Sequence, residues 1–457
     1  MVDLAAEKRT SLHGHWSSRF AFILAVAGSA VGLGNIWKFP YIAGVNGGGA
    51  FVLVYLLCVF IIGLPIMMAE ILMGRRGRRN PIATMRLLGE EEGGSRRWAI
   101  VGAVGVIAGF LILSYYSVIA GWAIAYIFQG ISGAFTSIDT EGVGAIFSSI
   151  SGSWALTGFW HTLFMVMTTV VVSKGVEQGL ERAVRVLMPA LLTLLLVLLF
   201  YSVIAGDFAA GLRFMFEPKF GDLTQAGVLS ALGHAFFTLS VGMGAVMAYG
   251  AYLPSEISIV RISIAVVSAD TVIAILAGLV IFPIVFANGL DPAAGPGLIF
   301  QSLPLAFGQL PGGIIIAGLF FLLLTFAAWT SAISLMEPAV AWLIEVHKLS
   351  REKAAFFVGG TIWLLGFFSV FSFSVLEDFQ PFGRTLFDNL DFLTSNIMLP
   401  LGGLLIVFFA GWVMRSNSSA EELDKEDAMP YLAWRFAARY IAPVAVVVIF
   451  LNAIGLL

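Results

Sequence analysis

Two short glycine-rich stretches interrupt long apolar segments, and they are the residues of this chain best suited to chemistry. The first is VGLG at residues 31–34, and the second is VGMG at residues 241–244. A helix interrupted inside a membrane frees carbonyl and amide groups that lipid cannot satisfy. Carbonyl oxygens with nearby Asn, Ser and Thr side chains suit a hard cation such as sodium, and the free N–H groups of a half-helix suit a carboxylate. The two stretches therefore predict a site for sodium and an anionic or zwitterionic solute.

Both stretches also have simpler interpretations. Glycines let neighbouring helices pack closely, as Gly28 and Gly32 could do in the first stretch. A dinucleotide-binding loop is excluded, because the pattern G-x-G-x-x-G would need a glycine at Trp37 and no strand–turn–helix pattern surrounds it. Two matched interruptions in corresponding positions favour unwound helices over packing glycines.

The composition is that of a membrane protein. Of the 457 residues, 59% are hydrophobic and 12% are charged, whereas soluble domains have about 25% charged residues. Uncharged runs of spanning length recur from end to end, so we expect one polytopic all-α bundle rather than several soluble domains. The net charge of −3 and the lack of a basic tract indicate no nucleic-acid partner. The single cysteine, Cys58, cannot form an intrachain disulfide.

Hydropathy and charge spacing predict about eleven membrane-spanning helices. The expected ranges are 17–40, 49–74, 98–129, 154–173, 183–206, 225–253, 260–288, 311–345, 354–374, 391–414 and 433–456. Of the 25 Lys and Arg residues, only Lys38, Arg213, Lys219 and Arg384 fall on the side opposite the N-terminus. This asymmetry predicts a cytoplasmic N-terminus in a multi-pass protein of the cell (inner) membrane. The acidic stretch 420–428 is expected to be a solvated cytoplasmic loop.

The two interruptions lie in the first and sixth expected spans. The sixth span follows the first by five spans, and because five is an odd number the second copy of a five-helix repeat must be inverted in the membrane. We therefore expect a single transporter domain over residues 1–457. Its parts would be a first repeat at 16–206, a second, inverted repeat at 225–414, and a peripheral eleventh helix at 433–456.

Longer motifs resemble the neurotransmitter:sodium symporter family, in its bacterial amino-acid branch. The motifs are WSSRFAFILAVAGSAVGLGNIWKFPYIAGVNGGGAF at 16–51, SYYSVIAGW at 114–122, FFTLSVGMG at 236–244 and TSAISLMEP at 330–338. The likeness covers essentially the whole chain, although other family members commonly have twelve spans. The resemblance implies a LeuT-type fold of two inverted five-helix repeats, with helices one and six unwound at mid-membrane. It also implies sodium-coupled import of a neutral amino acid by alternating access.

The resemblance further implies two sodium sites. The first would use the substrate carboxylate, the Ala30 carbonyl, the Asn35 amide, the carbonyl and hydroxyl of Thr238, and Asp270. The second would use the carbonyls of Gly28, Val31 and Ala327 and the hydroxyls of Thr330 and Ser331. A lone Ser or Thr in a membrane helix more often bonds its own backbone, so the assignment depends on the set.

Asp270 stands where relatives commonly have Asn. A buried carboxylate is costly unless a cation or partner neutralises it, and the alternative to a sodium ligand is a structural pair with a neighbouring helix. In chloride-dependent relatives the anion site uses positions that match Tyr55, His234, Thr238 and Ala274. Since His234 and Ala274 weaken that site and Asp270 supplies a fixed negative charge, we expect chloride-independent transport.

The implied substrate site surrounds the same breaks. The carboxylate would be held by the amides of Leu33 and Gly34 and the Tyr116 hydroxyl, and the amino group by carbonyls of Ala30, Phe237 and Thr238 with Ser240. The side chain of the substrate would contact Ile112, Ile119, Phe237, Met243 and Leu335. Ser331 would contact both the substrate and the second sodium ion. Ordinary core packing is the alternative for each apolar residue alone. Gly32 replaces the Asp of amine-transporting relatives, and the apolar pocket favours a neutral hydrophobic or aromatic amino acid.

Resemblance also suggests the closing elements. The outer latch would join Lys38 to Asp391, with Tyr116 and Phe237 as the lid, and most relatives have Arg at the Lys38 position. The inner latch would join Glu345 to the N-terminal segment, where Trp16 matches the family, His13 occupies the usual arginine position and Arg9 is a possible substitute. Gly179 and Pro189 reproduce a helix-breaking spacing in the fifth span, and Glu70 would bond the unwound part of span six. Ordinary solvated charges are the alternative for the latches.

Two other functions are alternatives to transport. A membrane enzyme is disfavoured, because the sequence has no H-E-x-x-H motif, nucleophile elbow or clustered metal ligands. A non-transporting amino-acid sensor or binding protein on the same fold would keep every binding residue, so sequence separates it poorly from a transporter.

Overall fold

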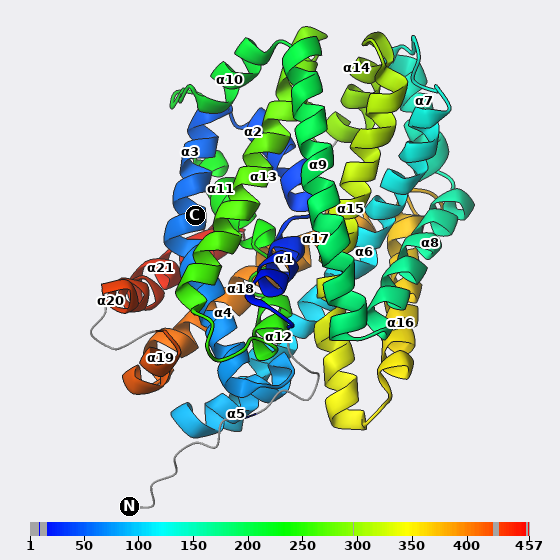
Figure 1. Ribbon diagram of the computed structural model, residues 1–457. Coiled ribbons are helices and arrows are strands. Elements are labelled where there is room, and N and C mark those ends of the chain that lie inside the picture. The colour runs from blue at the N-terminus through cyan, green and yellow to red at the C-terminus, as the bar shows by residue number, and fades with distance from the viewer. Residues whose placement is uncertain (1–8, 10–15, 296, 424–428, 454–455, 457) are drawn as a thin grey trace, which may run out of the picture.

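The computed structural model describes residue 9, residues 16–295, 297–423 and 429–453, and residue 456. Figure 1 shows a bundle in which every regular element of this described part is helical. The expectation of an all-α membrane protein is confirmed.

Most of the expected spans correspond to long helices. Within the described ranges, nine are long and apolar enough to cross a membrane: Gly49–Gly77, Arg96–Ile131, Trp154–Ser173, Val176–Ala205, Ile259–Ala287, Gly313–His347, Arg351–Ser372, Leu386–Val413 and Met429–Val448. A tenth span is formed if Arg19–Ala30 and Gly34–Val45, which meet at a bend of 49°, are counted together. The expected span 225–253 consists of two helices that are each shorter than a bilayer is thick. The exact number of eleven and the two repeat boundaries stay predictions.

The elements in these spans bear the labels of Figure 1. They are α1 (Arg19–Ala30), α2 (Phe39–Val45), α3 (Gly49–Cys58), α4 (Leu64–Gly77), α6 (Ala99–Ile131), α8 (Trp154–Ser173), α9 (Arg182–Ala205), α11 (Gln225–Thr238), α12 (Ala245–Ala251), α13 (Ile259–Ala287), α15 (Gly313–His347), α16 (Arg351–Ser372), α17 (Leu386–Asp391), α18 (Leu399–Phe408), α20 (Met429–Phe436) and α21 (Ala442–Ala453). The charge-free region 302–336 contains the start of α15, which begins at Gly313 directly after Gly312 in a left-handed conformation.

Five shorter helices lie outside the expected spans. They are α5 (Pro81–Gly93), α7 (Thr140–Ser151), α10 (Phe208–Phe216), α14 (Leu303–Gln309) and α19 (Ser416–Glu422). Helix α5 lies at the bottom of Figure 1 and α7, α10 and α14 lie at the top. We call the side of α5 the basic side, because the arginine-rich segment 75–97 lies there, and we call the other the opposite side.

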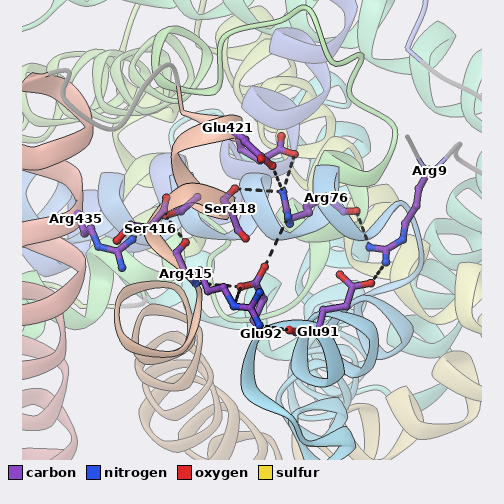
Figure 2. A network of polar contacts seen from close by, with 11 residues as sticks. Arg9, Arg76, Glu91, Glu92, Arg415, Ser416, Ser418, Glu421 and Arg435 are labelled. Carbon is purple, nitrogen blue, oxygen red and sulfur yellow. Dashed lines mark hydrogen bonds and ion pairs between the residues drawn. The ribbon is translucent and has the colours of Figure 1, made fainter. Parts of the chain in front are cut away.

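The acidic stretch differs from its expectation. Glu422, at the end of α19, lies 2.5 Å from Nε of Arg75, and Glu421 lies 3.0 Å from Nη1 of Arg76. Figure 2 shows how Arg76 sits between α19 and the glutamates of α5. The described part of the stretch is therefore a packed, ion-paired helix end rather than a solvated loop, and residues 424–428 lie outside the described residues.

Both glycine-rich stretches end helices inside the bundle. Helix α1 ends at Ala30, Val31 is extended (ψ 106°), and a π-helical turn, η1 (Gly34–Lys38), follows. Helix α11 ends at Thr238 and α12 begins after Gly244, with positive φ at Ser240, Gly242 and Gly244. Glycine adopts positive φ at little cost, which explains why the helix breaks at VGMG. Because α1 packs against α9, α12, α13 and α15, the breaks are enclosed by other helices.

Candidate functional site

The first predicted sodium ligands form one buried polar cluster. Asn35 Nδ2 donates to Asp270 Oδ1 at 2.7 Å and to Thr238 Oγ1 at 3.1 Å. The Thr238 hydroxyl in turn donates to Asp270 Oδ2 at 3.1 Å, and Asp270 itself is fully buried on α13. Asn35 Oδ1 accepts from the Gly32 amide at 2.9 Å, which ties the cluster to the break in α1.

This cluster contains one carboxyl group, and the donors that reach it are neutral. Among the ion pairs of the described ranges, none involves Asp270. Burial of an ionised carboxylate without a cation is unfavourable by several kcal/mol. The arrangement can therefore hold a monovalent cation among oxygen atoms, and it offers no lysine or arginine for the alternative of a structural ion pair.

The second predicted sodium ligands meet between α1 and α15. The Thr330 hydroxyl lies 3.0 Å from the Ala327 carbonyl and 3.4 Å from the Val31 carbonyl. The Ser331 hydroxyl lies 3.1 Å from the Val31 carbonyl and 3.4 Å from that of Gly28. These five residues bring together three carbonyl and two hydroxyl oxygens without any formal charge. Such an oxygen-only set suits a hard cation.

A narrow cavity lies between the two clusters. Ten of the twelve predicted substrate residues line it, together with Gly32: Ala30, Leu33, Gly34, Ile112, Tyr116, Phe237, Ser240, Met243, Ser331 and Leu335. Of the other two, Thr238 belongs to the first cluster and Ile119 lines a larger cavity on the opposite side. The narrow cavity measures about 20 Å³, which is little more than one water requires. Its walls must therefore move apart to admit an amino acid.

The backbone at Gly32 leaves no room for a side chain. A Cβ at this position would lie 2.4 Å from Ser331 Oγ and 2.8 Å from the Tyr116 hydroxyl oxygen. The Leu33 amide donates to the same Tyr116 hydroxyl at 3.2 Å. An acidic side chain at position 32 would therefore displace the hydroxyl groups of Ser331 and Tyr116 beside the break.

The predicted outer latch lies on the opposite side of the narrow cavity. Lys38 Nζ is 3.9 Å from Asp391 Oδ1 and 4.3 Å from the centre of the Phe237 ring. Tyr115 and Ser395 donate to the same Asp391 oxygen at 3.0 and 2.8 Å. The latch borders a cavity of about 330 Å³, whose wall includes the aromatic residues Trp37, Tyr116 and Phe237. Lys38 and Asp391 line this larger cavity, whereas Leu33, Tyr116 and Phe237 line both cavities.

At the predicted inner latch, the structure describes contacts between Glu345 and Asn80. Glu345 accepts from the Asn80 amide at 2.8 Å and from Asn80 Nδ2 at 2.6 Å. Arg9 instead pairs with Glu91 and donates to the Arg76 carbonyl, so it does not substitute at Glu345 (Figure 2). Partial burial and the nearby cations Arg76 and Arg79 lower the pKa of Arg9. His13 lies outside the described residues.

Trp16 packs on the end of α12 next to this region. Its ring contacts Tyr249 and Tyr252, and its Nε1 donates to the Tyr249 carbonyl at 3.3 Å. Sequence reasoning missed the neighbouring pair of Glu337 and Arg351, whose Oε2 and Nη2 atoms are 2.5 Å apart, with Tyr252 donating to Glu337 at 2.8 Å. The available signal was Glu337 itself, a charged residue inside an apolar segment.

The remaining predicted elements lie at helix irregularities. The Gly242 amide donates to Glu70 Oε1 at 2.5 Å, as expected for the broken sixth span. Pro189 lies inside α9, and Gly179 lies in a π-helical turn, η4 (Val176–Glu181), that precedes α9. A Cβ at Gly179 would lie 2.1 Å from the Val171 carbonyl, so only glycine fits there without a shift.

Comparisons with known proteins agree with this geometry. The model of the sodium:neurotransmitter symporter family matches residues 13–141 and 143–456. An uncharacterized sodium-dependent transporter of Bacillus subtilis, YhdH, is 40% identical over 97% of this chain and 98% of its own length. An uncharacterized sodium-dependent transporter of Haemophilus influenzae is 33% identical over 96% of this chain and 97% of its own. The crystal structure of MhsT in complex with L-phenylalanine superposes with a TM-score of 0.89 at 43% identity, covering 96% of this chain and 99% of that one.

Proposed function

Since the chain belongs to the sodium:neurotransmitter symporter family, and is thus a sodium-dependent transporter and not an enzyme, we propose that it imports neutral hydrophobic or aromatic L-amino acids. Import would proceed by alternating access, with two sodium ions bound at the Asp270 and Thr330 clusters. The basic side would face the cytoplasm of a cell whose inner membrane holds the protein, because arginine and lysine gather on that side.

One observation carries the proposal. The cluster of Asn35, Thr238 and Asp270, with its carboxyl group, adjoins a cavity that is lined by Gly34 and Tyr116. A sodium ion at the cluster would attract a substrate carboxylate at the break, and this attraction is strong in a medium of low dielectric constant. Binding of either would therefore favour binding of the other, which is the coupling that symport requires.

The cargo follows from the lining of the cavity. Ile112, Met243 and Leu335 offer no partner for a charged side chain, so desolvating one there would be costly. Position 32 is a glycine with little space around it, so this chain has no acidic side chain there to pair with an amine ligand. The complex of MhsT with L-phenylalanine supports a hydrophobic amino acid as the ligand of this chain too.

Chloride independence is part of the proposal. Asp270 is fully buried and supplies a fixed negative charge beside the first sodium cluster, so an additional anion would meet repulsion there. Ala274, on the same helix, has no hydroxyl to offer an anion. Replacing chloride by gluconate should leave uptake unchanged, and a collapse of uptake would contradict this part.

The latches and the fifth-helix break complete the cycle that we propose. Lys38 with Asp391 would close the opposite side above Phe237, and Glu345 with the segment that contains Trp16 would close the basic side. Unwinding between Gly179 and Pro189 would open a water path to the second sodium cluster, because α9 packs against α1 beside that cluster.

A reconstitution experiment tests the proposal. Purified protein in proteoliposomes should take up labelled L-phenylalanine in sodium medium and not in choline medium, and a panel of unlabelled amino acids should compete in order of apolar character. Sodium-dependent binding in detergent without uptake into vesicles would favour the sensor or binding protein on the same fold. Competition by charged amino acids as strong as that by leucine would refute the assignment of the pocket.

A further inference from the structure

A buried glutamate in the π-helical turn before α9 holds the beginning of α1. Glu181 is only 4% exposed. Its Oε2 accepts from the Ser17 backbone amide at 3.0 Å, and its Oε1 accepts from the Ser17 hydroxyl. Ser17 and Glu181 are 164 residues apart in the chain, so this contact joins two separate helices at their ends on the basic side.

Arg185 completes the contact. Its Nη2 lies 2.5 Å from Glu181 Oε1 and donates to the Ser17 hydroxyl at 2.5 Å. Because the Arg185 side chain is half exposed, its ion pair with Glu181 contributes little by itself. The bonds between Glu181 and Ser17 are charge-assisted and involve a buried carboxylate, and such bonds are the stronger ones. We call Ser17, Glu181 and Arg185 the α1 clasp.

The clasp sits on an irregular backbone. In η4 the amides of both Gly179 and Leu180 point at the Gly175 carbonyl, at 3.1 and 3.0 Å. One carbonyl therefore serves an α-type and a π-type bond, and π-helical turns of this kind recur at functional sites in helices. A change from one bond to the other would rotate Glu181, which ends the turn, relative to α1.

The same two helices meet again at the second sodium cluster. A Cβ placed on Gly28, whose carbonyl belongs to that cluster, would lie 3.2 Å from Met188 Sδ of α9. Met188 follows Glu181 by seven residues, about two helical turns. The segment from Glu181 to Met188 therefore touches α1 at its first residues and at its sodium ligands.

We propose that Glu181 is a positioning residue for the second sodium site: it holds the basic end of α1 against α9, and release of the clasp permits α1 to move and sodium to leave. The inference rests on the proposed sodium-coupled transport. Because sodium binds carbonyls of α1 and hydroxyls of α15 together, it favours the arrangement in which α1 is held in place. Weakening the clasp should therefore weaken sodium binding, by linkage between the two states of α1.

The test compares Glu181→Gln with a matched control, Glu177→Gln, in the full-length protein in lipid nanodiscs. Glu177 lies in the same π-helical turn and is exposed to solvent. Hydrogen–deuterium exchange at residues 17–30 and 174–190 is measured in sodium and in potassium, and the sodium concentration that gives half-maximal protection is determined. Ser17→Ala removes the clasp hydroxyl from the other helix, which keeps the test usable if Glu181→Gln folds poorly.

In the wild type and in Glu177→Gln, sodium should protect both segments. In Glu181→Gln the half-maximal sodium concentration should rise about fivefold or more, the scale expected for loss of charge-assisted hydrogen bonds. Ser17→Ala should shift it in the same direction by a smaller factor, and the double variant should show less than the product of the two shifts. A residue that only stabilises the fold would lower the melting temperature without moving the sodium midpoint.

The outcomes separate the two proposals. If sodium protects the wild type and Glu181→Gln has an unchanged midpoint and unchanged exchange at residues 17–30, the role of Glu181 is refuted while sodium coupling stands. If sodium gives the wild type no protection at all, the proposed sodium site fails, and the role assigned to Glu181 fails with it.

Discussion

The two predicted sodium clusters consist of different chemical groups. The Asp270 cluster consists of the side chains of Asn35, Thr238 and Asp270, which bond one another, and it is buried and contains a carboxyl group. The Thr330 cluster is neutral and consists of two carbonyls of the broken helix α1 that face one carbonyl and two hydroxyls of α15. The first is therefore specified by residue types. The second is specified by how closely α1 lies against its neighbours.

This difference assigns different roles to the clusters. A charged cluster beside the free amides of the break can link a sodium ion to a substrate carboxylate. A neutral cluster whose ligands come from two helices can bind sodium only while those helices lie together. We therefore expect substitutions at the first to disable binding and substitutions at the second to change sodium affinity and release.

The largest effect is expected from Asp270→Ala. Loss of the carboxylate leaves the sodium ion without its only charged protein ligand, and substrate binding in sodium should fall about 100-fold or more, which is about 2.7 kcal/mol. Asp270→Asn keeps an oxygen ligand, as in relatives that have Asn at this position, so its substrate binding in sodium should fall much less. Equilibrium binding of labelled L-phenylalanine to purified protein measures both variants. Equal losses in the two would show that the charge, and not the oxygen, holds the ion.

The double substitution Thr330→Val with Ser331→Ala should have the next largest effect. It removes both hydroxyls of the neutral cluster, and the half-saturating sodium concentration for uptake should rise about tenfold, or about 1.4 kcal/mol. The control is Thr325→Val on the same helix, because among the described residues the Thr325 hydroxyl bonds only the Phe321 carbonyl one turn away. A sodium dependence equal to that of the wild type would refute the assignment of a sodium site to the second cluster.

Pro189→Ala should slow the release of sodium to the basic side. An alanine restores a donor and allows α9 to remain helical through this position, so the segment from Gly179 should unwind less readily. The expected effect is about a threefold slower single-turnover efflux, about 0.65 kcal/mol, with unchanged equilibrium sodium affinity. Stopped-flow fluorescence in proteoliposomes can follow the step, and unchanged kinetics would count against the hinge.

Lys38→Arg should have the smallest effect. A guanidinium can bond Asp391 with two donors where the Lys38 ammonium lies 3.9 Å away. The closed outer latch should be favoured by about 0.5 kcal/mol, as for a partly exposed pair, so substrate dissociation toward the opposite side should slow about twofold. Faster dissociation would show that Lys38 and Asp391 do not form the latch.

Sequence reasoning succeeded where a function demands particular residues at particular positions. The two breaks and the bond from Gly242 to Glu70 followed from glycine and charge placement. It failed where pairing depends on distant segments: Arg76 with Glu421, and Arg9 with Glu91 rather than Glu345. Charges at the ends of spans have many possible partners, and only the packing of α5 and α19 selects among them.

The most direct test of the two-cluster account is the accumulation ratio of labelled L-phenylalanine in proteoliposomes at zero membrane potential. The logarithm of this ratio is measured against the logarithm of an imposed sodium gradient, in chloride-free medium. At thermodynamic balance the slope equals the number of sodium ions moved with each amino acid. If both clusters carry sodium, the slope is two. A slope of one would remove one cluster from transport, and a slope of zero would contradict sodium-coupled transport altogether.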